Sequence, residues 1–126
     1  MACTHQKRFG KKELTSSIRA GRSVAAESEI FVDFVIQGHS THHYAEQHSA
    51  YLEDLAQQSA KEFEEAAPER EIETSFRECQ AKLNLLAAQI LRVHLAIAAH
   101  DDEALLAAKD AIHRIRMSLE QRNSSP

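Results

Sequence analysis

The sequence is poor in residues that interrupt helices and in residues that build the cores of β-sheets. It has no tryptophan, three glycines and two prolines in 126 residues, and only 6% of its residues are aromatic. β-Domains need frequent turns, which use glycine and proline, and their strands are enriched in aromatic side chains. Alanine, leucine, glutamate, glutamine and arginine are abundant instead, and these residues lose little freedom in a helix. The composition therefore predicts one all-α domain.

Long apolar runs are absent as well. The longest covers residues 30–32, resumes at Phe34 after Asp33, and is far shorter than the ~20 residues of a membrane span. Basic residues near the N-terminus are not followed by the apolar stretch and cleavage site of a secretory signal. We therefore expect no membrane span and a cytoplasmic location. Cys3 and Cys79 do not form a disulfide framework, and we expect both to be reduced thiols.

Catalytic motifs are missing too. The chain has no G-x-S-x-G turn, no phosphate-binding loop and no glycine-rich dinucleotide turn. Its acidic runs, such as residues 101–103, are typical of solvated helix ends rather than of acid–base pairs. We expect no enzyme activity, no catalytic residue and no bound cofactor.

Charge divides the chain into a basic tail and an acidic body. Residues 1–22 hold six of the 15 lysines and arginines but one of the 19 acidic residues, so their net charge is +5 against −9 for the rest. We expect a basic, partly disordered tail over residues 1–22, a helical bundle domain over 23–122 and a frayed tail over 123–126. Within the basic tail, residues 12–20 are compatible with a short helix that Gly21 ends. The candidate contacts for nucleic acid or another anion are Lys7, Arg8, Lys11 and Lys12.

Residues 23–37 fit two descriptions. Ser23 can cap a helix and Gly38 can end it, with Ile30, Phe31, Phe34 and Val35 on one side of the wheel. The same stretch is rich in strand-forming residues. A strand needs a partner and no second candidate is evident, so helix is favoured, with a strand pair across a dimer as the alternative.

A second helix is predicted over residues 41–66, with Ser40 or Thr41 as its cap. Its apolar stripe recurs every three or four residues. Pro68 is expected to end this helix and to lie in the first turn of the next one. The stripe consists of Tyr44, His48, Tyr51, Leu55, Ser59 and Phe63.

The strongest periodicity covers residues 69–99, where apolar residues alternate spacings of four and three over about four heptads. Leu85, Leu91 and Leu95 widen this seam, as in a helical bundle. A further stripe over residues 105–119 is out of phase by one residue, and the shift falls at His100, Asp101 and Asp102. We therefore predict a tight turn there and an antiparallel hairpin rather than one rod. The seam consists of Ile72, Phe76, Cys79, Leu83, Leu86, Ile90, Val93 and Ile97, and the second stripe of Leu105, Ala108, Ile112, Ile115 and Leu119.

The predicted fold is an antiparallel helical bundle of three long helices plus a shorter N-terminal helix, preceded by a basic flexible tail. Long stripes on few helices leave apolar surface exposed in a monomer, and pairing with a second copy commonly covers it. We therefore expect a protein partner or self-association, with a homodimer favoured.

Histidines are concentrated near the start of the second helix, where four of the chain's eight fall between residues 39 and 48. His39/His43 and His42/Glu46 have the i, i+4 spacing that lets two side chains bind one metal ion. The candidate metal ligands are therefore His39, His42, His43 and Glu46, for Zn, Ni or Cu. His48 points elsewhere and is expected to be a hydrogen-bonded core histidine.

Three functions remain open at this point. The first is a non-catalytic helical interaction protein, such as a small regulatory, adaptor or chaperone-like subunit. The second is a metal-responsive binding protein that uses the histidine cluster. The third is a nucleic-acid accessory protein with a basic N-terminal arm.

Overall fold

The computed structural model describes the backbone of residues 7–124 and the side chains of residues 8–121. Two three-residue strands and a 3-10 turn (Arg70–Ile72) accompany four helices in this part of the chain. The all-α prediction is confirmed at the level of class. The elements are β1 (Lys7–Phe9), α1 (Lys11–Ile36), α2 (His42–Glu64), β2 (Ala66–Pro68), α3 (Glu73–Ala98) and α4 (Asp102–Ser124).

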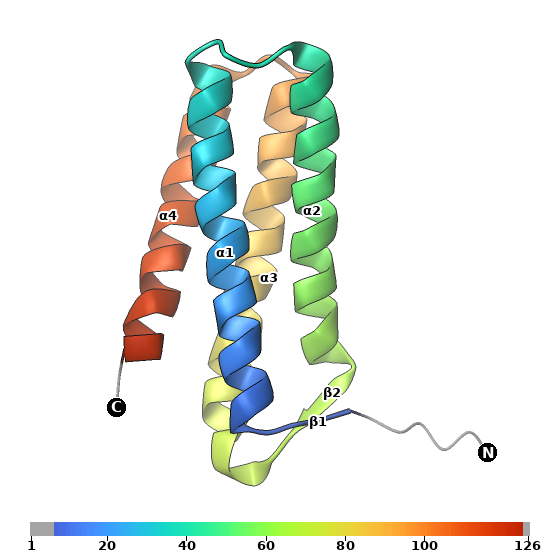
Figure 1. Ribbon diagram of the computed structural model, residues 1–126, viewed down its shortest axis with the longest axis vertical. Helices are drawn as coiled ribbons and strands as arrows, with labels where there is room; N and C mark the ends of the chain where they lie inside the picture. The colour runs from blue at the N-terminus through green and yellow to red at the C-terminus, as the bar shows by residue number, and fades with distance from the viewer. Residues whose placement is uncertain (1–6, 125–126) are drawn as a thin grey trace, which may run out of the picture.

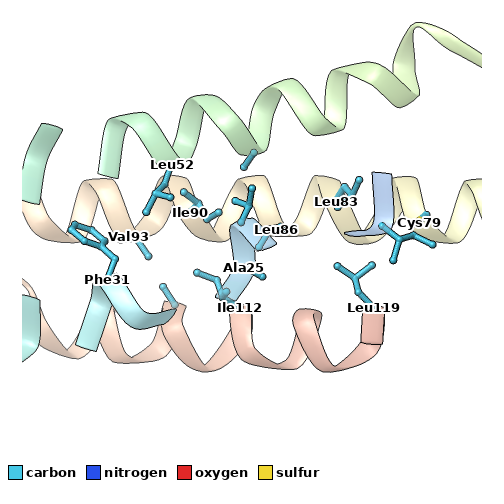
Figure 2. Close-up of a cluster of buried hydrophobic side chains, with 14 of the residues drawn as sticks. Ala25, Phe31, Leu52, Cys79, Leu83, Leu86, Ile90, Val93, Ile112 and Leu119 are labelled. Carbon is cyan, nitrogen blue, oxygen red and sulfur yellow. The ribbon is translucent and has the colours of Figure 1, made fainter. Parts of the chain in front are cut away.

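The four helices pack side by side as a bundle, and the chain reverses direction at each connection between them (Figure 1). The most extensive contacts join α2 to α3, α1 to α4 and α3 to α4, whereas α1 and α2 touch less. Figure 2 shows α3 running between α2 and α4, with Leu52, Ile112 and Leu119 directed toward it. α3 is therefore the central element of the core.

The first helix is long, which corrects two expectations. α1 runs without interruption over Lys11–Ile36, so residues 11–22 belong to the bundle and not to a tail, and the N-terminal helix is not shorter than the others. Residues 23–36 are helical, not a strand. Gly21 does not end the helix. It lies where α1 approaches α3 closely, since a Cβ there would lie 2.5 Å from Cδ2 of Leu83. Residues 1–6 and 125–126 of the two predicted tails lie outside the described residues.

The segment before α1 is held in place by a buried aromatic cluster. Phe9 is 1% exposed, and its ring centroid lies 5.2 Å from that of Phe63 and 5.5 Å from that of Phe76. Strand β1 pairs in parallel with β2, and the Glu69 amide donates to the Phe9 carbonyl at 2.8 Å. This pairing was not predicted, because neither strand has a periodic pattern in the sequence.

Pro68 was predicted to lie in the first turn of a helix, but it lies in β2. α3 begins at Glu73 and not at residue 69. A proline at the end of a strand needs no backbone N–H donor there, so the position costs no ladder hydrogen bond. The cap of α2 was predicted correctly: the Thr41 hydroxyl accepts from the Tyr44 amide at 3.2 Å.

The buried face of α2 differs from the predicted stripe. Small residues make up most of it, and Phe63 is the one fully buried residue that the prediction and the structure share. Tyr44 and Tyr51 are about half exposed. Small side chains let α2 approach α3 closely, while tyrosines keep their hydroxyl groups in water. The buried residues are Ala45, Ser49, Leu52, Ala56, Ala60 and Phe63.

The seams of α3 and α4 agree with the periodicity. From Phe76 to Ile97 every predicted seam residue of α3 is buried, and four of the five residues predicted for α4 are buried, with Ile115 partly so. The turn lies where the phase shift placed it. His100 takes a positive φ of 53°, and the Asp101 carboxylate accepts from the Ala104 amide at 3.0 Å to cap α4.

One apolar segment, Arg70–Ala98, is long and hydrophobic enough to cross a membrane by length and composition alone, with a mean hydropathy of 1.3 in its best window. It coincides with α3. The core helix of a helical bundle can meet the same criteria, and 33% of the residues in that window are buried. The expected absence of a membrane span stays a prediction.

If Phe9 anchors β1 in the core, Phe9→Ala should lower the free energy of unfolding by about 3–5 kcal/mol, the usual cost of removing a buried phenyl ring. Urea denaturation followed by circular dichroism measures this. The matched control is Phe34→Ala on α1, where the ring is 41% exposed; it should cost within about 1 kcal/mol. Equal effects of the two substitutions would show that β1 is not part of the folded core.

Candidate functional site

The outer surface between α3 and α4 carries an apolar groove of about 410 Å³. Alanines form most of its walls, and their methyl groups are too short to fill the space between the two helices. Leu95, which is 59% exposed, borders the groove. We call this surface the alanine groove; its lining residues are Gln89, Arg92, Leu95, Ala96, Ala99, Asp101, Ala104, Ala107, Ala108 and Ala111.

The leucines that were expected to widen the α3 seam lie outside the core. Leu85 is 56% exposed and Leu91 is 38% exposed, like Leu95 on the same helix. Burying a leucine from water contributes about 1.5–3 kcal/mol, so three uncovered leucines on one helix leave a substantial hydrophobic contribution unused in the monomer. Of the three, Leu95 borders the alanine groove, and an exposed apolar residue beside an apolar groove is typical of interaction surfaces.

A second groove, of about 610 Å³, lies between α1 and α4 and contains a charged network. Its centre is Glu29, a carboxylate only 9% exposed. His113 Nδ1 lies 2.7 Å from Glu29 Oε1, and Arg116 Nε donates to Oε2. Arg116 also donates to Glu120 at 2.7 Å. The hydrogen bond to Glu29, and then the one to Glu120, raise the pKa of Arg116, so its guanidinium stays charged.

This network has the form of an acid–base pair, since a carboxylate orients a histidine that is itself 47% exposed. Serine, threonine and cysteine are not among the described residues that line the groove. Lys109, on the same wall, donates to Asp33 across the two helices. Each cation is thus paired with a carboxylate of the chain, and the arrangement fixes α4 against α1.

The predicted metal site is only partly assembled. His42 Nε2 lies 3.0 Å from Glu46 Oε1, and the His42 ring stacks on that of His100 at 4.3 Å. His39 precedes the Thr41 cap, outside the helix, and its ring lies 5.6 Å from that of Phe34. The i, i+4 relation between His39 and His43 therefore does not apply. Within residues 7–124, no group of three or more His, Cys, Asp or Glu side chains is placed to hold a metal ion.

His48, His94 and His113 bridge helices. His48 is partly buried, as its ring lies 4.7 Å from that of Phe31 and its Nε2 3.6 Å from Glu27 on α1. His94 on α3 bonds Glu53 on α2 at 2.7 Å through Nδ1. No local spacing in the sequence indicates the pairs of His94 and His113, because their partners are 41 and 84 residues away.

The predicted anion-contact residues are distributed over β1 and α1. The Lys7 backbone is in β1, and its side chain lies outside the described residues. Arg8, Lys11 and Lys12 are exposed, and the two lysines form the first turn of α1, so they sit on a folded helix instead of a flexible arm.

Comparison of the chain with protein-family models, with curated proteins and with solved structures found no match.

If Glu29 holds α1 and α4 together, Glu29→Gln should lower the free energy of unfolding by about 1–3 kcal/mol, the range for a hydrogen bond to a charged group. In an Arg116→Met background the same change should cost measurably less, since the two residues share one interaction. Thermal and urea unfolding of the four proteins gives the coupling.

The control pair is Asp110 and Arg114, which are bonded along the surface of α4 with both side chains more than 60% exposed. Asp110→Asn should change the free energy of unfolding by no more than about 1 kcal/mol. Additive effects of Glu29→Gln and Arg116→Met would contradict the proposed coupling.

Proposed function

We propose that this chain is a non-catalytic helical interaction protein, such as a small regulatory, adaptor or chaperone-like subunit, that binds protein through the alanine groove. The observation that supports this most directly is a groove walled by small side chains beside a leucine that is 59% exposed. Amphipathic helices dock into grooves of this kind by inserting large apolar residues between small ones.

The chemistry of the groove separates it from the other concave surface. The α1/α4 groove holds three acidic side chains and three cations or histidines, most of them already bonded to one another. The alanine groove has one cation and one carboxylate among ten lining residues. A partner covering it would remove apolar surface from water with little cost in desolvated charge.

The partner-binding proposal predicts contact at Leu95 in the cell. p-Benzoylphenylalanine in place of Leu95 should give discrete covalent adducts on irradiation, identified by mass spectrometry. The same photoreactive residue in place of Gln57, an exposed residue of α2, is the control and should give none above background. An absence of adducts at Leu95 in a folded, well-expressed protein would contradict the proposal.

The basic surface supports a second candidate, a nucleic-acid accessory role. Lys11, Lys12 and Arg19 line a shallow hollow along the first turns of α1, with Arg8 exposed just before it. Side chains fixed on a helix lose less freedom on contacting phosphates than those of a flexible arm. The metal-responsive alternative has less support, because only His42 and Glu46 of its four proposed ligands are bonded to each other.

For the nucleic-acid role, a mobility shift with random-sequence duplex DNA should appear at about 50 mM salt and vanish by about 200 mM, since phosphate contacts release counterions. Lys11→Gln combined with Lys12→Gln should abolish it. An unshifted duplex at the lower salt concentration would dispose of this candidate.

A further inference from the structure

The alanine groove carries opposite charges on the two sides of Leu95. Arg92 lies on α3 three residues before Leu95, and Asp101 lies beyond Ala99, in the turn that leads to α4. α3 rises about 1.5 Å per residue, so Arg92 is about 4.5 Å from Leu95 along the axis and Ala99 about 6 Å in the other direction. Leu95 therefore lies between a basic residue and, further along in the other direction, an acidic residue.

The side chains of Arg92 and Asp101 can each form a further hydrogen bond with a partner. No ion pair or hydrogen bond joins the Arg92 side chain to another group in the described part of the chain, and the residue is exposed. Asp101 uses Oδ1 to cap α4, at 3.0 Å from the Ala104 amide. Its second carboxylate oxygen can accept from a guanidinium without loss of the cap.

We infer that the alanine groove is covered by the same groove of a second copy, packed antiparallel about a two-fold axis that passes beside Leu95. This inference rests on the proposed function and names its partner. A two-fold contact repeats every pair twice, so Arg92 lies on the same side of the axis as Asp101 of the partner subunit, about 4.5 Å from it along the helix direction, and the same pair recurs on the other side. A parallel pairing would instead set Arg92 against the identical arginine.

The shapes of the two surfaces suit this arrangement. Leu95 is the large side chain of the groove, and Ala99, Ala104, Ala107 and Ala111 are the small ones around it. Near the two-fold axis, each Leu95 enters the space left by the alanines of the other copy, as a knob enters a hole. Both copies then bury a leucine that is 59% exposed in the monomer.

The first experiment measures mass and symmetry together. Light scattering after size-exclusion chromatography should give twice 14.2 kDa. In a Cys3→Ser background, Leu95→Cys should form a disulfide-linked dimer on mild oxidation, because residues beside a two-fold axis meet their own copies. The thiol of Cys79 is 1% exposed and should not react.

The matched control is Leu85→Cys. Leu85 is also a leucine of α3, and its exposed fraction is nearly the same as that of Leu95. Leu85 lies about 15 Å along α3 from the proposed axis, so its two copies are about 30 Å apart. A disulfide requires Cα atoms about 4.4–6.8 Å apart, so this variant should stay monomeric on denaturing gels.

Charge substitutions test the antiparallel orientation. Arg92→Glu should raise the dimer dissociation constant by about 10-fold or more, because it sets a glutamate against Asp101 of the partner subunit. Adding Asp101→Ser to this variant should recover part of the loss, since serine keeps a helix cap but removes the repelling charge. Melting temperatures of all variants confirm that they are folded.

Three results would overturn the inference. One is a monomer up to about 100 μM, well above the Kd of a weak specific dimer. The second is a dimer that links through Leu85→Cys and not through Leu95→Cys. The third is a dimer whose dissociation constant does not change in the Arg92→Glu variant.

A monomer whose photoreactive Leu95 variant captures a different protein would overturn the inference alone. A dimer that forms through another face, without Leu95 adducts, would contradict the proposed function as well.

Discussion

The packing of the other three helices against the buried face of α3 is the contact on which the rest of the structure depends. Phe76, Leu83, Leu86, Ile90 and Val93 are each at most 1% exposed, and they form one continuous strip along the helix. α1 has its most extensive contacts with α4 and α2 with α3, whereas α1 and α2 touch each other less, so their relative position is set mainly through α3 and α4. Loss of this strip would leave the remaining helices without a shared apolar surface.

Polar pairs refine the packing that α3 provides. A carboxylate and a histidine meet across α1 and α2 (Glu27 and His48), across α2 and α3 (Glu53 and His94) and across α1 and α4 (Glu29 and His113). Within the alanine groove, by contrast, no side-chain bond joins α3 to α4 among the described residues.

The strongest periodicities gave the correct helices because large apolar residues carried them. The seams of α3 and α4 and the turn at Asp101 followed directly from spacing. The stripe of α2 was misplaced because Ala45, Ser49 and Ala56 are buried, and small residues register weakly in a hydrophobic pattern. β1 and β2 were missed because three-residue strands have no period, and their pairing depends on tertiary contacts of Phe9.

The candidate site was only partly accessible to sequence reasoning. Leu85, Leu91 and Leu95 were expected to widen the buried seam of α3, but they are exposed. The alanines of α4 that line the groove were not predicted to belong to a binding surface. Nothing local in the sequence says that these two sets form one groove, since that depends on how α3 and α4 pack. The Glu29 network is likewise a tertiary feature, since its partners are more than 80 residues apart in the chain.

The anchoring of Phe9 has a consequence for the order of events during synthesis. Its ring contacts Phe63 and Phe76, which the ribosome adds 54 and 67 residues later. At translation rates of about 5–20 residues per second, the partners of Phe9 are made about 3–13 s after it. Over that interval the N-terminal segment has no core to enter. α1 therefore leaves the ribosome with its first turn and the preceding phenylalanine accessible to chaperones, and the bundle closes only when the segment from β2 to α3 has been made.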